Sequence, residues 1–208
     1  MNIVMDQKRN NTDKDKNKEV KHQILQAAKK LFSKNGFNGT TVRQICDEAN
    51  VSLALVSYHF GGKENVFYEI FDPLRLPFMD SEFTLSEPKQ DLIFFCKTFV
   101  IYRYEEQELF NILQQELLLK SPRIDMLKDV FLPSWEQLRS ILLACKEKGV
   151  IDSPSIDMAV NFVMGTLMFT LNNPFLNPSN DNHTPEEAAE LAVGYILNGL
   201  QSSASDSR

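Results

Sequence analysis

Residues 41–63 read TVRQICDEANVSLALVSYHFGGK, and this stretch decides the fold of the first third of the chain. Thr41 and the glutamine three residues later fit a capping box, in which each side chain satisfies an amide that the first helical turn leaves unpaired. Asn50 stands where this helix should end, because asparagine tolerates the left-handed backbone of a helix end. Ser52 is a suitable N-cap for a second short helix over residues 53–59. Two short helices around a tight turn predict a helix-turn-helix, whose second helix can enter the major groove of DNA.

The wider stretch GFNGTTVRQICDEANVSLALVSYHFGGKENVF resembles the DNA-binding domain of TetR-family transcriptional regulators. The matching residues are Gly36, Phe37, Thr40, Thr41, Val42, Ile45, Ala49, Val51, Ser52, Tyr58, His59, Phe60, Lys63 and Glu64. The resemblance covers roughly residues 20–75. The chain departs from the commonest pattern at two positions: Asn50 replaces the usual turn glycine, and Ser57 stands where an aromatic residue is frequent.

The rest of the chain is also predicted to be helical. Apolar residues recur at helical spacing over residues 19–35, 63–77, 89–104, 108–119, 123–148, 156–172 and 185–200, and no alternating strand pattern competes with them. We therefore expect an all-α chain with an N-terminal three-helix helix-turn-helix domain at 19–65. A C-terminal helical bundle at 66–208 follows, and the resemblance implies that it binds an effector and dimerises.

Residues 1–18 form a polar and charged segment, and we expect this tail to be disordered. Its lysines and Arg9 can lie along DNA as a basic arm, as some homeodomain arms do. The alternative is a solvated tail, because three aspartates dilute the positive charge.

The net charge of −6 is unevenly distributed along the chain. Residues 1–69 hold eleven Lys and Arg against eight Asp and Glu, whereas residues 70–208 hold eleven against twenty. Because only the part that approaches phosphate has to be positive, this asymmetry agrees with an N-terminal DNA reader. Neither a membrane-spanning run nor an apolar signal core occurs, so we expect a cytoplasmic protein.

Candidate DNA contacts come from the two short helices and their flanks. Leu53, Ala54 and Ser57 are candidates for the groove, and Arg43 can reach a base edge or a phosphate. The remaining candidates, expected mainly at phosphates, are Thr40, Thr41, Ser52, Tyr58, His59 and Lys63. Lys63 is chosen because it begins a helix, where unpaired amides and partial positive charge favour an anion.

Two further sets of candidates lie in the C-terminal bundle. Its aromatic and thioether side chains either form plain core or surround a ligand cavity between helices. The candidate effector contacts are Phe95, Phe99, Tyr102, Gln114, Trp135 and Met164. Small and apolar residues on the last two helices suit either a two-fold dimer interface or packing within one chain. The candidate interface residues are Phe162, Gly165, Phe169, Leu191 and Tyr195.

The most direct hypothesis is a homodimeric repressor released from its operator, a double-stranded DNA site, by a small and largely apolar effector. A DNA-bound architectural or partner-recruiting protein without a ligand is the alternative. We expect no enzyme, because no nucleophile–base set, paired carboxylates or phosphate loop can be assembled. No cofactor or metal is predicted either, since the three histidines share no ligand spacing. The three cysteines stand in apolar helical patterns, which favours reduced, buried thiols over a redox switch.

Overall fold

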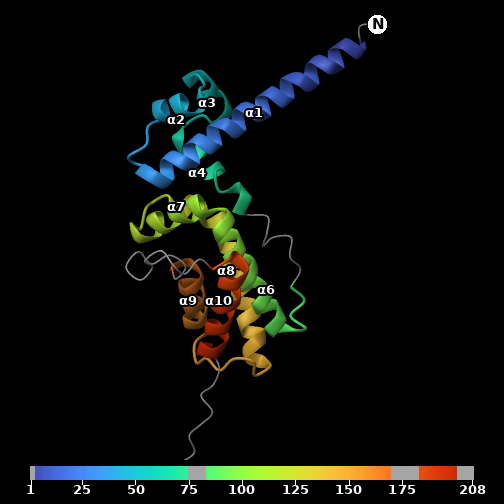
Figure 1. Ribbon diagram of the computed structural model, residues 1–208, viewed down its shortest axis with the longest axis vertical. Helices are drawn as coiled ribbons and strands as arrows, with labels where there is room; N and C mark the ends of the chain where they lie inside the picture. Colours follow the sequence, from blue (N-terminus) through green and yellow to red (C-terminus); the bar gives the residue numbers. More distant parts are fainter. Residues whose placement is uncertain (1–2, 75–82, 170–182, 201–208) are drawn as a thin grey trace, which may run out of the picture. The chain divides into compact units, whose positions relative to one another are not determined.

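The computed structural model describes residues 3–74, 83–169 and 183–200, with the backbone alone for residues 3–14 (Figure 1). The described residues form helices and contain no strand, so the predicted all-α class is confirmed. They divide into two compact units. The first unit holds residues 1–73 and 111–126, and the second holds residues 74–110 and 127–208. The ends of the helices predicted at 63–77 and 156–172 lie outside the described residues.

The first helix, α1 (Ile3–Asn35), starts earlier than the sequence analysis predicted. The backbone is helical from residue 3 onward, within the segment for which the sequence predicts disorder. No glycine or proline occurs before Gly36, so once the buried part of the helix has formed, adding further turns is cheap. Gly36 ends α1 with a φ of 70°, as predicted.

The helix-turn-helix consists of α2 (Val42–Ala49) and α3 (Leu53–Phe60). The capping box of α2 is confirmed, because the Gln44 amide donates to Thr41 Oγ1 at 3.2 Å and the Thr41 amide donates to Gln44 Oε1 at 2.8 Å. Asn50 ends α2 in the left-handed region, at φ 53° and ψ 46°. Ser52 is the N-cap residue of α3, but its side chain makes no capping hydrogen bond.

Helix α4 (Lys63–Glu69) completes the DNA-reading domain, which consists of α1 to α4 and is called the reader below. A 3₁₀ turn (Asp72–Leu74) follows α4. The helix predicted over 63–77 therefore ends early, and Pro73, which cannot continue an α-helix hydrogen-bond pattern, lies in the 3₁₀ turn. Helices α1, α2, α3 and α4 pack against one another around an aromatic core. The Phe32, Phe37 and Phe67 rings meet with centroids 5.1–5.6 Å apart. Three apolar residues of this unit, Leu31, Val42 and Val51, are only half-buried.

Residues 111–126 also belong to the first unit, which moves the domain boundary away from the predicted 65/66. They include most of α7 (Gln107–Leu118) and the first residues of α8 (Ile124–Glu147). Gln115 Nε2 donates to the carbonyl of Ser33 on α1 at 3.3 Å. The first unit is therefore built from two separate stretches of the chain.

The second unit contains α6 (Pro88–Glu105), the remainder of α8, α9 (Ile156–Phe169) and α10 (Pro185–Leu200). Helix α10 packs against α6 and α9, and α6 also contacts α9. Helix α10 begins with a second capping box, in which the Glu187 amide donates to Thr184 Oγ1 at 3.2 Å. Among the described residues, no helix combines the length and the apolar character needed to cross a bilayer.

The cysteines are free and buried, as predicted. Burial raises the pKa of Cys96 to about 12 and that of Cys145 to about 11, because a thiolate would lose its hydration. Both groups therefore stay protonated at neutral pH, which disfavours the redox-switch alternative.

We predict that the backbone of Asn50 controls the stability of the helix-turn-helix. Asn50→Ala should lower the unfolding free energy by about 1–2 kcal/mol, because alanine pays the steric cost of the left-handed region. Asn50→Gly should leave stability nearly unchanged, since glycine adopts this conformation freely. Thermal unfolding followed by circular dichroism compares the two variants, and equal melting temperatures would contradict the prediction.

Candidate DNA-binding surface

Helix α3 presents one exposed face and one buried face. Leu53 and Tyr58 are 58% and 75% exposed, and Ala54 and Ser57 are exposed beside them. On the opposite face Val56 and Phe60 are buried in the core of the first unit. The exposed face offers methyl groups, a hydroxyl and a phenol, which suit thymine methyls and phosphate oxygens.

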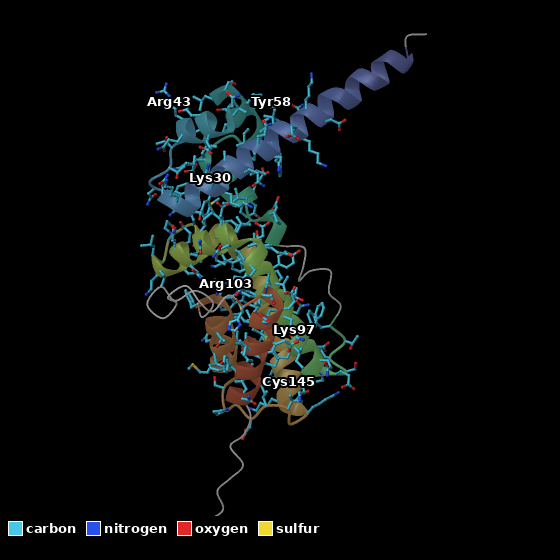
Figure 2. The ribbon with its side chains drawn as sticks, in the orientation of Figure 1. Lys30, Arg43, Tyr58, Lys97, Arg103 and Cys145 are labelled. Atoms are coloured by element: carbon cyan, nitrogen blue, oxygen red, sulfur yellow. The ribbon has the colours of Figure 1, made fainter. Side chains whose placement is uncertain are left out.

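The start of α2 lies next to α3 in the chain and in the fold, since the two helices contact each other. Thr41 and Arg43 are exposed there, and Ser52 is exposed at the start of α3. Figure 2 labels Arg43 on α2 and Tyr58 on α3. Arg43 is the long cationic side chain of the predicted set that remains exposed, so it is the strongest candidate for a charged DNA contact.

Thr40 was expected at a phosphate, and this expectation is wrong. Its side chain is buried, and its hydroxyl donates to the carbonyls of Leu31 at 3.2 Å and Gly36 at 2.9 Å. A hydroxyl that satisfies the end of α1 in the protein interior has no access to DNA. Thr40 therefore stabilises the α1–α2 connection and does not contact DNA through its hydroxyl.

Lys63 was also expected at a phosphate, but its ammonium group is bound inside the first unit. Nζ donates to the carbonyls of Phe37 at 3.0 Å and Thr40 at 2.8 Å. The same nitrogen lies over the Phe37 ring, 4.1 Å from its centroid. The start of α4 is thereby fastened to the loop that leads into α2, so Lys63 positions the reader.

His59 is half-buried at the end of α3 and cannot use both ring nitrogens towards DNA. Its Nε2 atom is buried and has no hydrogen-bond partner among the described residues. Its ring packs against that of Tyr58, with centroids 5.1 Å apart. The burial of Nε2 argues against a phosphate contact through this atom, so the His59 candidate depends on its other ring nitrogen.

A charged pair in residues 111–126, which the sequence did not predict, packs against the helix-turn-helix domain. Glu116 is 2% exposed and accepts two hydrogen bonds from Arg123, at 2.9 and 3.2 Å. The Arg123 guanidinium lies 4.1 Å from the centroid of the Phe37 ring. One signal was present in the sequence: Leu109, Leu113 and Glu116 share the buried face of α7, and an acid on an apolar face needs a partner.

In the second unit, the candidate effector residues are aromatic side chains and one methionine, buried to different degrees. Phe95, Phe99 and Met164 are buried, whereas Tyr102 and Trp135 are half-buried. Gln114 belongs to the first unit, so the structure does not assemble all six candidates in one unit.

The candidate interface residues lie on α9 and α10, which contact each other. Phe162, Phe169, Leu191 and Tyr195 are exposed apolar or aromatic side chains, and Gly165 is half-buried. The Phe162 ring packs closely over Gly199, where an added Cβ would lie 2.9 Å from it. Phe162 therefore combines packing within the chain with an exposed edge.

The sequence and the fold both match known proteins. The model of the family described as bacterial regulatory proteins, tetR family, matches residues 24–70, which hold the end of α1, α2, α3 and α4. The chain is similar to the HTH-type transcriptional repressor NicS of Pseudomonas putida, with 30% identity over 134 residues that cover 61% of this chain and 63% of NicS. It is also similar to the probable HTH-type transcriptional regulator YttP of Bacillus subtilis, with 24% identity over 76% of this chain and 78% of YttP.

Among solved structures, HlyIIR, a hemolysin II transcriptional regulator, superposes with a TM-score of 0.73. The two sequences are 28% identical, and the match covers 90% of this chain and 99% of HlyIIR. Residues 24–70 are a helix-turn-helix domain of the tetR family of bacterial regulatory proteins. The chain is therefore a transcriptional regulator of the DNA-binding helix-turn-helix type, and α3 is the second helix of that motif.

We predict that Lys63 and Arg43 affect operator binding in different ways. Lys63→Met should lower the unfolding free energy by about 2 kcal/mol, because two carbonyls lose a charged donor. It should weaken DNA binding without changing the salt dependence of the affinity. Arg43→Ala should leave the melting temperature unchanged and reduce the salt slope by about one, as expected for one lost phosphate contact.

Binding isotherms at several salt concentrations, with melting curves of both variants, separate the two roles. A reduced salt slope for Lys63→Met would restore the phosphate contact that the sequence suggested.

Proposed function

We propose that this protein is a cytoplasmic repressor that binds its operator as a homodimer and leaves it when a small, largely apolar effector binds. The exposed face of α3, with Leu53, Ala54, Ser57 and Tyr58, carries the DNA-binding part of the proposal. Relatives named as repressors, NicS among them, support the sign of regulation.

Base recognition by this surface should be modest. Leu53 and Ala54 offer only apolar contacts, and Ser57 offers a single hydroxyl. Long bidentate donors, which discriminate bases most strongly, are missing from the exposed face of α3. Sequence-dependent shape and deformability of the duplex should therefore contribute to operator choice.

Dimerisation is supported by the exposed apolar side chains of α9 and α10. Phe162, Phe169, Leu191 and Tyr195 are large, and their exposure on two contacting helices is costly unless another surface covers them. A two-fold partner presents the same helices and can cover them with an identical set. Two readers then contact half-sites about 34–36 Å apart, or a multiple of this distance.

The route from effector to reader follows the chain. Helix α7 starts in the second unit and continues into the first, and α8 runs from the first unit into the second. Glu116 on α7 binds Arg123 in the α7–α8 connection, and Arg123 packs on Phe37, whose carbonyl also accepts from Lys63. A ligand that prefers one arrangement of α7 and α8 would shift the equilibrium by its difference in affinity for the two states.

The proposal is tested by selecting binding sites from a pool of random duplexes with the full-length protein. We expect the selected duplexes to contain two inverted half-sites, and footprinting should show protection at both. Enrichment of single half-sites, or of no sequence, would contradict dimeric operator binding. If selected duplexes stay bound in the presence of every apolar compound tried, the architectural alternative replaces effector release.

We predict that the surface of α9 and α10 holds the dimer together. Leu191→Glu should convert the dimer to a monomer and weaken operator binding at least about a hundredfold, because a charge at an apolar interface is left without water. Leu132→Glu on α8 is the matched control, since Leu191 and Leu132 are 41% and 50% exposed. Size-exclusion chromatography with light scattering gives the mass, and a dimer in both variants would place the interface elsewhere.

A further inference from the structure

Arg103 is a buried cation in the second unit. It stands in the last turn of α6 and is 8% exposed (Figure 2). Its Nη1 atom donates to the carbonyl of Leu167, in the last turn of α9, at 2.7 Å. The guanidinium satisfies a carbonyl near the described end of α9 and has further N–H donors to offer.

Arg103 meets little negative charge in the described part of the second unit. Among the residues that the structure describes, no carboxylate forms an ion pair with Arg103, and the Leu167 carbonyl supplies only a partial negative charge. Burial lowers the pKa of Arg103 to about 10, so the group is still protonated at neutral pH. A buried charge without a counter-charge is costly, and such groups are frequent at binding sites.

Aromatic rings extend from Arg103 along the same face of α6. Phe95, Phe99 and Arg103 are spaced four residues apart and are all buried. The centroids of Phe95 and Phe99 lie 6.4 Å apart, and Phe110 packs on Phe99 at 5.3 Å. One end of this row is cationic and the remainder is apolar.

We infer that Arg103 binds the carboxylate of the effector, whose apolar chain lies along Phe99 and Phe95. This inference rests on the proposed release by an effector and defines the chemical class of the ligand. One guanidinium matches one negative charge, which favours a monocarboxylate over a dianionic phosphate ester. An aliphatic acid of medium chain length combines this anion with a chain that the phenylalanines can cover.

The test measures binding of decanoate and 1-decanol to the full-length protein by isothermal titration calorimetry. The two probes have the same chain length and differ in the charged group. We expect the wild-type protein to bind decanoate at least about tenfold more tightly than decanol. Arg103→Gln should weaken decanoate binding about tenfold and leave decanol binding within about twofold.

Arg139→Gln is the matched control. It removes the same charge from the second unit, where Arg139 is exposed and pairs with Asp157 at 3.0 Å. Its decanoate affinity should equal that of the wild type. Arg103→Lys keeps the charge but loses the planar guanidinium, so its decanoate affinity should lie between those of the wild type and Arg103→Gln. This variant provides the test if Arg103→Gln does not fold.

Three results would overturn the inference: wild-type protein that binds no decanoate, equal affinity for decanoate and decanol, or the same loss in Arg103→Gln and Arg139→Gln. A parallel gel shift with a selected operator separates this failure from failure of the proposed function. If decanol releases the protein from the operator and decanoate does not, the proposed release by an effector is supported and carboxylate binding by Arg103 is contradicted.

Discussion

The packing of two cations on the Phe37 ring is the interaction on which the structure of the first unit depends. Lys63 Nζ and the Arg123 guanidinium each lie 4.1 Å from the centroid of this ring, and cations over an aromatic face are stabilised further where water is scarce. Lys63 comes from the start of α4, and Arg123 comes from the connection between α7 and α8. Two segments remote in sequence therefore hold the loop that leads into α2, and the angle at which α2 and α3 are presented follows from this contact.

Buried charge is used in two different ways in this protein. Glu116 is buried with a bidentate partner, Arg123, so its cost is offset within the first unit, and the pair can act as a structural brace. Arg103 is buried in the second unit, and among the described residues its acceptor is the carbonyl of Leu167. The cost of removing a charge from water therefore indicates a structural role for the Glu116–Arg123 pair and a ligand-binding role for Arg103. The difference is whether the protein itself supplies the opposite charge.

Local signals in the sequence were reliable where the physics is local. The capping box at Thr41, the left-handed Asn50 and the end of the first helix at residue 35 were all predicted, because each depends on one side chain and its own backbone. The extent of α1 was not predicted. Polar composition was taken as a sign of disorder, although nothing in residues 3–18 interrupts a helix that is already formed.

Side-chain roles at the candidate site depended on contacts that cross the sequence. Thr40 and Lys63 carry groups that suit a phosphate, and only the fold turns them inward, to carbonyls of the α1–α2 connection. The sequence by itself determined the all-α class, the helix-turn-helix and the face that α3 exposes, since periodicity and capping are properties of neighbouring residues. The tertiary structure decided which cations remain available, because burial and hydrogen-bond partners are set by segments such as residues 111–126 that lie far away in the chain.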